Sequence, residues 1–455
     1  MSAKFLNDLL SAITIRGRRV LDRDGGWPVR DGDVAVAELA ETILSQSGEA
    51  ASRALARRLL GRFEALPAAA RTEFFLALLT RFGPDRAAVD AAIAAYRTDP
   101  SEAHACGLHM AAEPRRQALI RRLNSAPGGA KALVEMRAAL IEAMAQHPEL
   151  LEVDQDFEHL LSSWFNRGFL VLERIDWSTP AAILEKIIRY EAVHAIHDWD
   201  ELRRRIDPCD RHCLAFFHPA LVDDPLIFVE VALTKGMPDA IAPILAEGRT
   251  KLPAEAADTA VFYSISNCQK GLRGISFGNF LIKQVVDEMT RDLPNLERFV
   301  TLSPAPTFMR WLKQRLRDDP EGLLSRGQAE MIRKLERPGW HAEAKTADSL
   351  KRIVMSLAAY YFLHAKRADG QPVDPVTRFH LGNGARLERI NWLADTSPRG
   401  LAGAGGMMVN YLYERRDIER NHEAYFGHNK VVTSSDVTKL LEHKVSSRAL
   451  VTING

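Results

Sequence analysis

Three glycines stand between a segment typical of a strand and a segment typical of a helix. They are Gly271, Gly274 and Gly278 in the stretch "KGLRGISFG". Before them, "TAVFYSISN" (259–267) is rich in β-branched and aromatic residues, and after them apolar residues recur at helical spacing as far as about Arg291. The first N–H groups of a helix have no intrahelical partner, and glycines let an anion approach the backbone closely. The pattern predicts a phosphate-binding loop.

The glycine spacing narrows the class of phosphate ligand. A P-loop needs G-x-x-x-x-G-K-[ST], and a dinucleotide fingerprint needs G-x-G-x-x-G with an acidic residue about 20 positions further on. This chain has G-x-x-G-x-x-x-G and matches neither motif. The stretch that begins at Gln269 is similar to the R/Q-x-x-G-x-G/A loop with which GNAT acyltransferases hold the pyrophosphate of coenzyme A. On these residues alone, a glycine-rich helix entry made for packing stays the alternative.

A serine is expected beside this loop. The helix after the glycines leads to "RFVTL" (298–302), which predicts a right-handed crossover between two parallel strands. Ligands of such sheets bind at the carboxyl ends of the strands. Ser303 directly follows the second strand and should therefore lie next to whatever the loop binds. A serine hydrolase is disfavoured, because the chain has no G-x-S-x-G elbow and Ser303 precedes a proline instead of a helix.

Composition excludes several classes of protein. The 455 residues carry a net charge of +1, so no global field attracts nucleic acid or anionic membranes. No apolar run approaches the roughly 20 residues of a membrane span, and the N-terminus lacks the features of a signal peptide. Four cysteines are too few for a disulfide framework, and "CDRHC" (209–213) lacks a second ligand pair for zinc. We expect a cytoplasmic protein without a metal and without a nucleic-acid or membrane partner.

The pattern of apolar residues changes near residue 170, from one typical of helices to one typical of strands. Segments such as "DVAVAELAETILSQ" (33–46) and "RTEFFLALLTRFG" (71–83) have the helical period, whereas "GFLVLERIDW" (168–177) and later segments are strand-like. We predict an α+β protein with two domains. Residues 1–170 would form an all-helical bundle that serves as a scaffold or oligomerisation surface, and residues 171–455 a mixed α/β catalytic domain.

Several long segments of the second part of the chain belong together. They are "FFHPALVDDPLIFVEVALT", "FYSISNCQKGLRGISFGNFLIK", "TLSPAPTFMRWL" and "FHLGNGARLERINWLAD", followed by "NYLY". These segments resemble the malonyl-CoA decarboxylase family, in its bacterial type. The resemblance implies a helical oligomerisation domain before a GNAT-like catalytic domain. It also implies a homo-oligomer, a tetramer built as a dimer of dimers. The implied activity is decarboxylation of malonyl-CoA to acetyl-CoA and CO2, for which we expect no cofactor.

The resemblance also implies the site residues. The family's catalytic serine falls on Ser303 in "TLSPAP", its histidine on His380 in "FHLGNGA", and its active-site tyrosine on Tyr413 in "NYLY". We expect Ser303 to orient the malonyl group and His380 to protonate the enolate. The coenzyme A loop corresponds to Arg273, Gly274, Ile275, Ser276, Phe277, Gly278 and Asn279.

Supporting residues and alternative functions complete the prediction. Asn383 or Asn391 could bond a ring nitrogen of His380 and fix its tautomer. His218 in "FFHPAL" is a weaker candidate for the site, with a loop contact as its alternative role. An acyl-CoA-dependent acyltransferase of the same fold stays open, and Glu230 is the one carboxylate evidently near the sheet that could serve as its base. A sensor that binds malonyl-CoA without chemistry is the third possibility.

Overall fold

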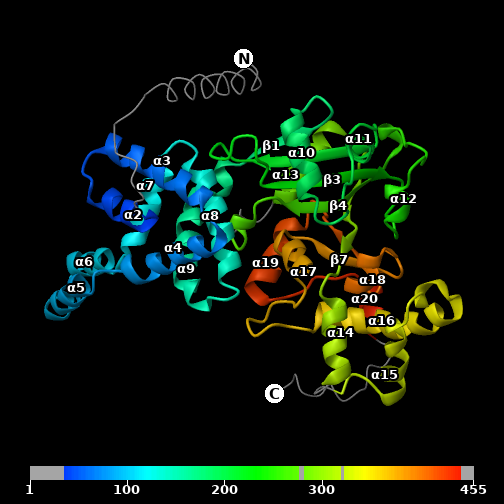
Figure 1. The fold of residues 1–455 in the computed structure, drawn as a ribbon. Coiled ribbons are helices and arrows are strands. Elements are labelled where there is room, and N and C mark those ends of the chain that lie inside the picture. Colours follow the sequence, from blue (N-terminus) through cyan, green and yellow to red (C-terminus); the bar gives the residue numbers. More distant parts are fainter. Residues whose placement is uncertain (1–34, 276–280, 319–321, 442–455) are drawn as a thin grey trace.

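The computed structural model describes residues 35–275, 281–318 and 322–441 (Figure 1). A helical module comes first in the chain and lies to one side of the molecule, drawn in blue and cyan. The described residues from Val171 onward form a mixed sheet with its covering helices. The predicted class, a helical part followed by a mixed α/β part, is confirmed. Within the described residues, no helix is long and apolar enough to cross a membrane.

The helical module contains the segments that the 3.6-residue period indicated. Rings of Phe63, Phe74 and Phe75 meet at its centre, with centroids 5.6–6.2 Å apart. The helices are α2 (Val36–Ser45), α3 (Glu49–Ala65), α4 (Ala68–Arg81), α5 (Arg86–Thr98), α6 (Glu102–Ala112), α7 (Arg115–Asn124), α8 (Gly129–Ala143) and α9 (Leu151–Trp164).

Eight strands make one sheet with the order β1-β2-β3-β4-β5-β8-β6, and β7 also pairs with β8. All neighbours are antiparallel except β4 and β5, which are parallel and are connected through α13 (Leu281–Asp292). The predicted parallel pair is therefore confirmed. The strands are β1 (Val171–Ile175), β2 (Arg211–Phe217), β3 (Ile227–Thr234), β4 (Thr259–Asn267), β5 (Arg298–Thr301), β6 (Ser303–Pro304), β7 (Arg386–Asn391) and β8 (Met408–Leu412).

Strand pairing is interrupted inside the sheet. β4 and β5 pair only as far as Phe262 opposite Thr301. Beyond this point β6 continues along β8, with Ser303 opposite Val409. Residues 264–267 of β4 pair with β3 and, among the described strands, with no strand on the β5 side. A shift of register against β3 falls at the same place on β4 and marks a β-bulge. Ser303 therefore lies beside an interruption in strand pairing between β4 and β6, which is called the gap below.

Helices from the second part of the chain cover the sheet and extend beyond it (Figure 1). The most important for the site is α17 (Pro375–Gly382), which precedes β7. The others are α10 (Ala181–Tyr190), α11 (Trp199–Ile206), α12 (Ala242–Leu245), α14 (Phe308–Arg317), α15 (Arg326–Ile332), α16 (Ala344–Leu363), α18 (Pro398–Ala404), α19 (Ile418–His428) and α20 (Ser435–Lys439).

Candidate active site

Ser303, His380 and Tyr413 form a hydrogen-bonded chain. The Oγ atom of Ser303 lies 2.9 Å from Nε2 of His380, and the hydroxyl of Tyr413 lies 2.8 Å from Nδ1. The three side chains come from β6, from α17 and from the residue after β8, and all three are buried. The structure thus brings together the three residues that the sequence resemblance singled out.

A buried carboxylate fixes the helix that carries His380. Asp374 is the N-cap of α17, and its Oδ1 accepts hydrogen bonds from the backbone N–H of Thr377 (2.9 Å) and from the Thr377 hydroxyl (3.2 Å). Its Oδ2 accepts from the hydroxyls of Tyr361 (3.2 Å) and Thr307 (3.3 Å). Pro375 at the first helical position has its φ angle preset for the helix. Asp374 therefore ties the start of α17 to α16 and to the loop before α14.

Tyr411 supports the imidazole from its face. The rings of Tyr411 and His380 stack with centroids 4.5 Å apart and planes inclined by 26°, and the Tyr411 hydroxyl lies 2.7 Å from Oγ1 of Thr377. The sequence patterns did not single out Tyr411, Asp374 or Thr377 as residues of the site. The "DPVT" signature, an N-cap acid followed by proline, marks the start of a helix but gives no sign of the contact with Tyr411.

Neither asparagine expected beside His380 contacts its ring nitrogens. The side-chain N–H of Asn383 donates to the carbonyl oxygen of Phe379 (2.9 Å), and that of Asn391 donates to Oδ1 of Asn410 (2.7 Å). The expectation was wrong because Asn383, at the C-cap of α17, folds back on its own helix, and because Asn391 is bonded across the β7–β8 pair. The buried Oδ1 of Asn383 has no hydrogen-bond partner among the described residues.

Burial keeps the hydrogen-bonded chain uncharged. It lowers the pKa of His380 to about 3, so the imidazole is neutral at physiological pH. Burial also raises the pKa of the Tyr413 hydroxyl well above its usual value, which keeps the phenol protonated. One imidazole nitrogen then carries a proton and the other accepts one, as a proton-transferring chain requires.

The lowered pKa of His380 makes a prediction about stability. In the unfolded chain the residue titrates near 6.5, so between about pH 6.5 and 3 the unfolded state binds more protons and the fold loses stability as the pH falls. From pH 7 to pH 5, the unfolding free energy of the wild type should fall by about 2 kcal/mol more than that of His380→Asn. Urea unfolding of both proteins at the two pH values measures this, and an equal fall in both would contradict it.

A cavity of about 500 Å³ lies between the start of the glycine loop, α17 and α19. Lys270, Arg273 and Arg378 line it, and none of its described lining residues is acidic. Phe379 and Asn383, which flank His380 on α17, also belong to its wall. Ser303 and His380 do not line the cavity themselves, but the helix that carries His380 forms part of its wall. The cationic lining suits a phosphorylated ligand.

Part of the predicted coenzyme A loop can be placed. Arg273, Gly274 and Ile275 line the cavity, and Gly274 has φ +85°, a conformation that favours glycine. Ser276, Phe277, Gly278 and Asn279 lie outside the described residues. The described start of the predicted loop thus lies in the cavity wall.

His218 has the alternative role that the sequence offered. It follows β2, and its Nδ1 accepts a hydrogen bond from the backbone N–H of Ala220 (3.1 Å). Its ring packs against Phe165 and Phe169, with centroids 4.7 and 6.0 Å away. His218 does not line the cavity, so its contacts are those of a loop residue at the junction with the helical module.

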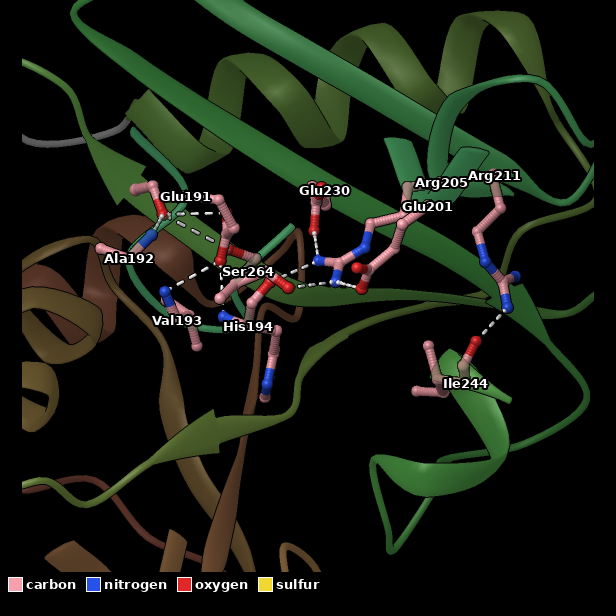
Figure 2. A network of polar contacts seen from close by, with 12 residues as sticks. Glu191, Ala192, Val193, His194, Glu201, Arg205, Arg211, Glu230, Ile244 and Ser264 are labelled. Atoms are coloured by element: carbon pink, nitrogen blue, oxygen red, sulfur yellow. Dashed lines mark hydrogen bonds and ion pairs between the residues drawn. The ribbon is translucent and has the colours of Figure 1, made fainter. Parts of the chain in front are cut away.

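Glu230 is fully buried within the sheet and cannot be reached from solvent. Its side chain is fully buried on β3, and its Oε2 lies 3.2 Å from Nη1 of Arg205 (Figure 2). The Nη2 atom of the same arginine lies 2.6 Å from Oε1 of Glu201. Burial, reinforced by the nearby charge of Glu191, raises the pKa of Glu230 to about 8. The carboxyl group therefore serves a buried polar network and is not open to the cavity.

Comparisons with known proteins identify the family. The malonyl-CoA decarboxylase N-terminal domain matches residues 82–165, and the C-terminal domain matches residues 168–451. The mitochondrial malonyl-CoA decarboxylase of Anser anser anser is 39% identical over 351 residues, which are 71% of this chain and 69% of the relative. The crystal structure of malonyl-CoA decarboxylase from Rhodopseudomonas palustris is 57% identical with a TM-score of 0.87, covering 89% of this chain and 98% of that one. The crystal structure of malonyl-CoA decarboxylase from Agrobacterium vitis is 54% identical with a TM-score of 0.85, and the match covers 90% of this chain and 100% of that one. The chain therefore belongs to the malonyl-CoA decarboxylase family, in its bacterial type.

Proposed function

We propose that this carboxy-lyase decarboxylates malonyl-CoA to acetyl-CoA and CO2, and that Ser303 and His380 carry the reaction. Membership of the family supports the reaction. The observation that supports these two residues is the 2.9 Å contact between Ser303 Oγ and His380 Nε2, beside the gap in strand pairing. We propose that no metal or organic cofactor takes part, because the thioester carbonyl of the substrate is itself an electron sink.

The substrate would enter the gap in the sheet. The cationic cavity wall and the glycine loop would bind the phosphates of coenzyme A. The pantetheine arm would then run along residues 264–267 of β4, where backbone groups on the β5 side have no strand partner among the described residues. The unpaired Oδ1 of Asn383 offers one further acceptor on the cavity wall. This path leads the malonyl group to Ser303.

Decarboxylation breaks the bond between the carboxylate and the α-carbon. The electron pair of that bond moves to the thioester oxygen and forms an enolate, CO2 leaves, and the α-carbon then takes up one proton. The Ser303 hydroxyl would orient the malonyl group by a hydrogen bond, and in a buried site such a donor stabilises developing charge strongly. A proton donor placed next to the enolate carbon completes the reaction.

His380 suits the role of this donor. The malonyl carboxylate would favour the protonated imidazole when it binds, because a nearby opposite charge raises the pKa of a histidine. When the carboxylate has left as CO2, its negative charge no longer favours the imidazolium. Burial then lowers the pKa of His380 toward about 3, so the imidazolium releases its proton readily. Tyr413 would hold Nδ1 and so keep the ring in place, with Tyr411 stacked on its face.

The two alternative functions have less support. An acyltransferase needs a base that an acceptor can reach, and Glu230 is fully buried and paired with Arg205. A sensor needs no reactive pair, and the Ser303–His380 contact would then have no role. The predicted tetramer, built as a dimer of dimers, and the cytoplasmic location remain parts of the proposal.

The test is to incubate the purified protein with malonyl-CoA in D2O, without metal or acceptor, and to follow coenzyme A thioesters by mass spectrometry. We expect conversion to acetyl-CoA that carries one deuterium, since the enolate takes its proton from an exchangeable group. Malonyl-CoA that binds and stays intact would favour the sensor. Turnover only after an amine acceptor is added would favour the acyltransferase.

A further inference from the structure

We propose that Arg137 of the helical module is a positioning residue for the coenzyme A site, because it holds the start of the glycine loop by that loop's backbone. The inference rests on the proposed function of the loop as the phosphate-binding element. It assigns to the helical module a part in substrate binding, in addition to its predicted part in assembly.

The guanidinium of Arg137 bonds two elements at once. Arg137 lies on α8 and is 2% exposed. Its Nε and Nη2 atoms donate to the two carboxylate oxygens of Asp154 on α9, at 2.8 and 3.1 Å. Its Nη1 donates to the carbonyl oxygens of Gly271 (3.0 Å) and Arg273 (2.9 Å). The carboxylate fixes the direction of the planar guanidinium, and the remaining nitrogen fixes the loop.

A second contact locks the same segment against α8. The turn at Lys270–Leu272 lies so close to this helix that a Cβ atom on Gly271 would stand 1.7 Å from the carbonyl oxygen of Val134. Only glycine permits this approach. The backbone of the loop is therefore held both by hydrogen bonds and by close packing, and both contacts come from the helical module.

The hydrogen bonds also orient the loop toward the ligand. In a planar trans peptide the C=O and the N–H point in opposite directions. Because the carbonyl of Arg273 points to Arg137, the N–H of Gly274 in the same peptide points away from α8. Arg273 and Gly274 both line the cavity, so this N–H is placed to meet an anion there.

The test compares two double variants. Arg137→Leu with Asp154→Leu removes the loop contact and leaves no uncompensated buried charge. The matched control is Arg116→Leu with Asp156→Leu, because this pair is also buried, also joins a helix of the module to α9, and has no hydrogen bond to the loop. Calorimetric titration with coenzyme A gives the Kd, and steady-state kinetics with malonyl-CoA gives KM and kcat.

For the Arg137 double variant we expect Kd and KM to rise about tenfold or more, with kcat changed less than about threefold. The control should keep the wild-type Kd and KM. Arg137→Lys, which can pair with Asp154 but lacks the fork that reaches both carbonyls, should show an intermediate Kd and also serves if the double variant fails to fold.

Two outcomes would overturn the inference: wild-type Kd in both Arg137 variants, or an equal rise in Kd in the control. Failure of the proposed function gives a different result. If the wild type binds coenzyme A without decarboxylating malonyl-CoA, the reaction is wrong, and the comparison of Kd values still decides the role of Arg137.

Discussion

Ser303→Ala and His380→Asn should each lower kcat for acetyl-CoA formation by about 10²–10⁴-fold. Ser303→Ala removes the donor that would orient the malonyl group, and His380→Asn removes the proton donor for the enolate. KM should change little, because in the proposed binding mode the phosphates of coenzyme A contact the loop and the cavity wall, which neither Ser303 nor His380 lines. Initial rates of acetyl-CoA formation, measured at saturating malonyl-CoA, give the comparison.

Two further variants show whether such losses are specific. Tyr413→Phe removes the contact with Nδ1 and keeps the ring, so kcat should fall by about tenfold. Ser356→Ala deletes another buried serine hydroxyl, one on α16 that has no hydrogen-bond partner among the described residues, and should leave kcat at the wild-type value. Near-normal turnover by Ser303→Ala would refute the proposed role of that hydroxyl.

Asp374→Ala should lower both stability and activity. The change leaves the backbone N–H of Thr377 without its cap. The hydroxyls of Tyr361 and Thr307 keep their mutual contact of 2.6 Å but lose the carboxylate as an acceptor. Since these groups are buried or partly buried, we expect a loss of about 2–4 kcal/mol in unfolding free energy. The start of α17 then shifts and displaces His380, so kcat should fall as well. Urea unfolding and kinetics below the transition measure the two effects.

Asp85→Ala is the matched control for Asp374→Ala. Asp85 caps α5 with the same kind of bonds, from the backbone N–H groups of Ala87 (3.0 Å) and Ala88 (3.3 Å), but it is exposed. Asp85→Ala should lower the unfolding free energy by about 1 kcal/mol and leave kcat unchanged. Similar losses in both variants would mean that burial of Asp374 and its link to α17 are not what matters.

Local chemistry predicted the elements that surround the gap well. The strand expected at 259–267 is β4, the segment after the glycines leads to a parallel β5, and Ser303 lies where the second strand ends. Each of these follows from residue pattern, loop chemistry and the handedness of crossovers, which act over short stretches of chain.

Residue patterns over short stretches of chain could not predict the contacts of His380. Its partner Ser303 is 77 residues away in the chain and Tyr413 is 33 residues away, so the meeting depends on how β6, α17 and β8 pack. Asn383 looked suitable because it is close in sequence, yet its amide caps its own helix. Arg137 is 134 residues from Gly271, and nothing in its own helix marks it as different from other arginines.

The unpaired part of β4 has a consequence for solubility and aggregation. Free strand edges normally lie at the rim of a sheet, where they can recruit a strand from another chain. Here residues 264–267 pair with β3 alone among the described strands, and they lie inside the sheet order, with β3 on one side and β5, β8 and β6 on the other. A strand from another chain is added at the rim of a sheet, and this stretch is not at the rim. The interruption in pairing therefore carries less of the association hazard that an outer edge would bring.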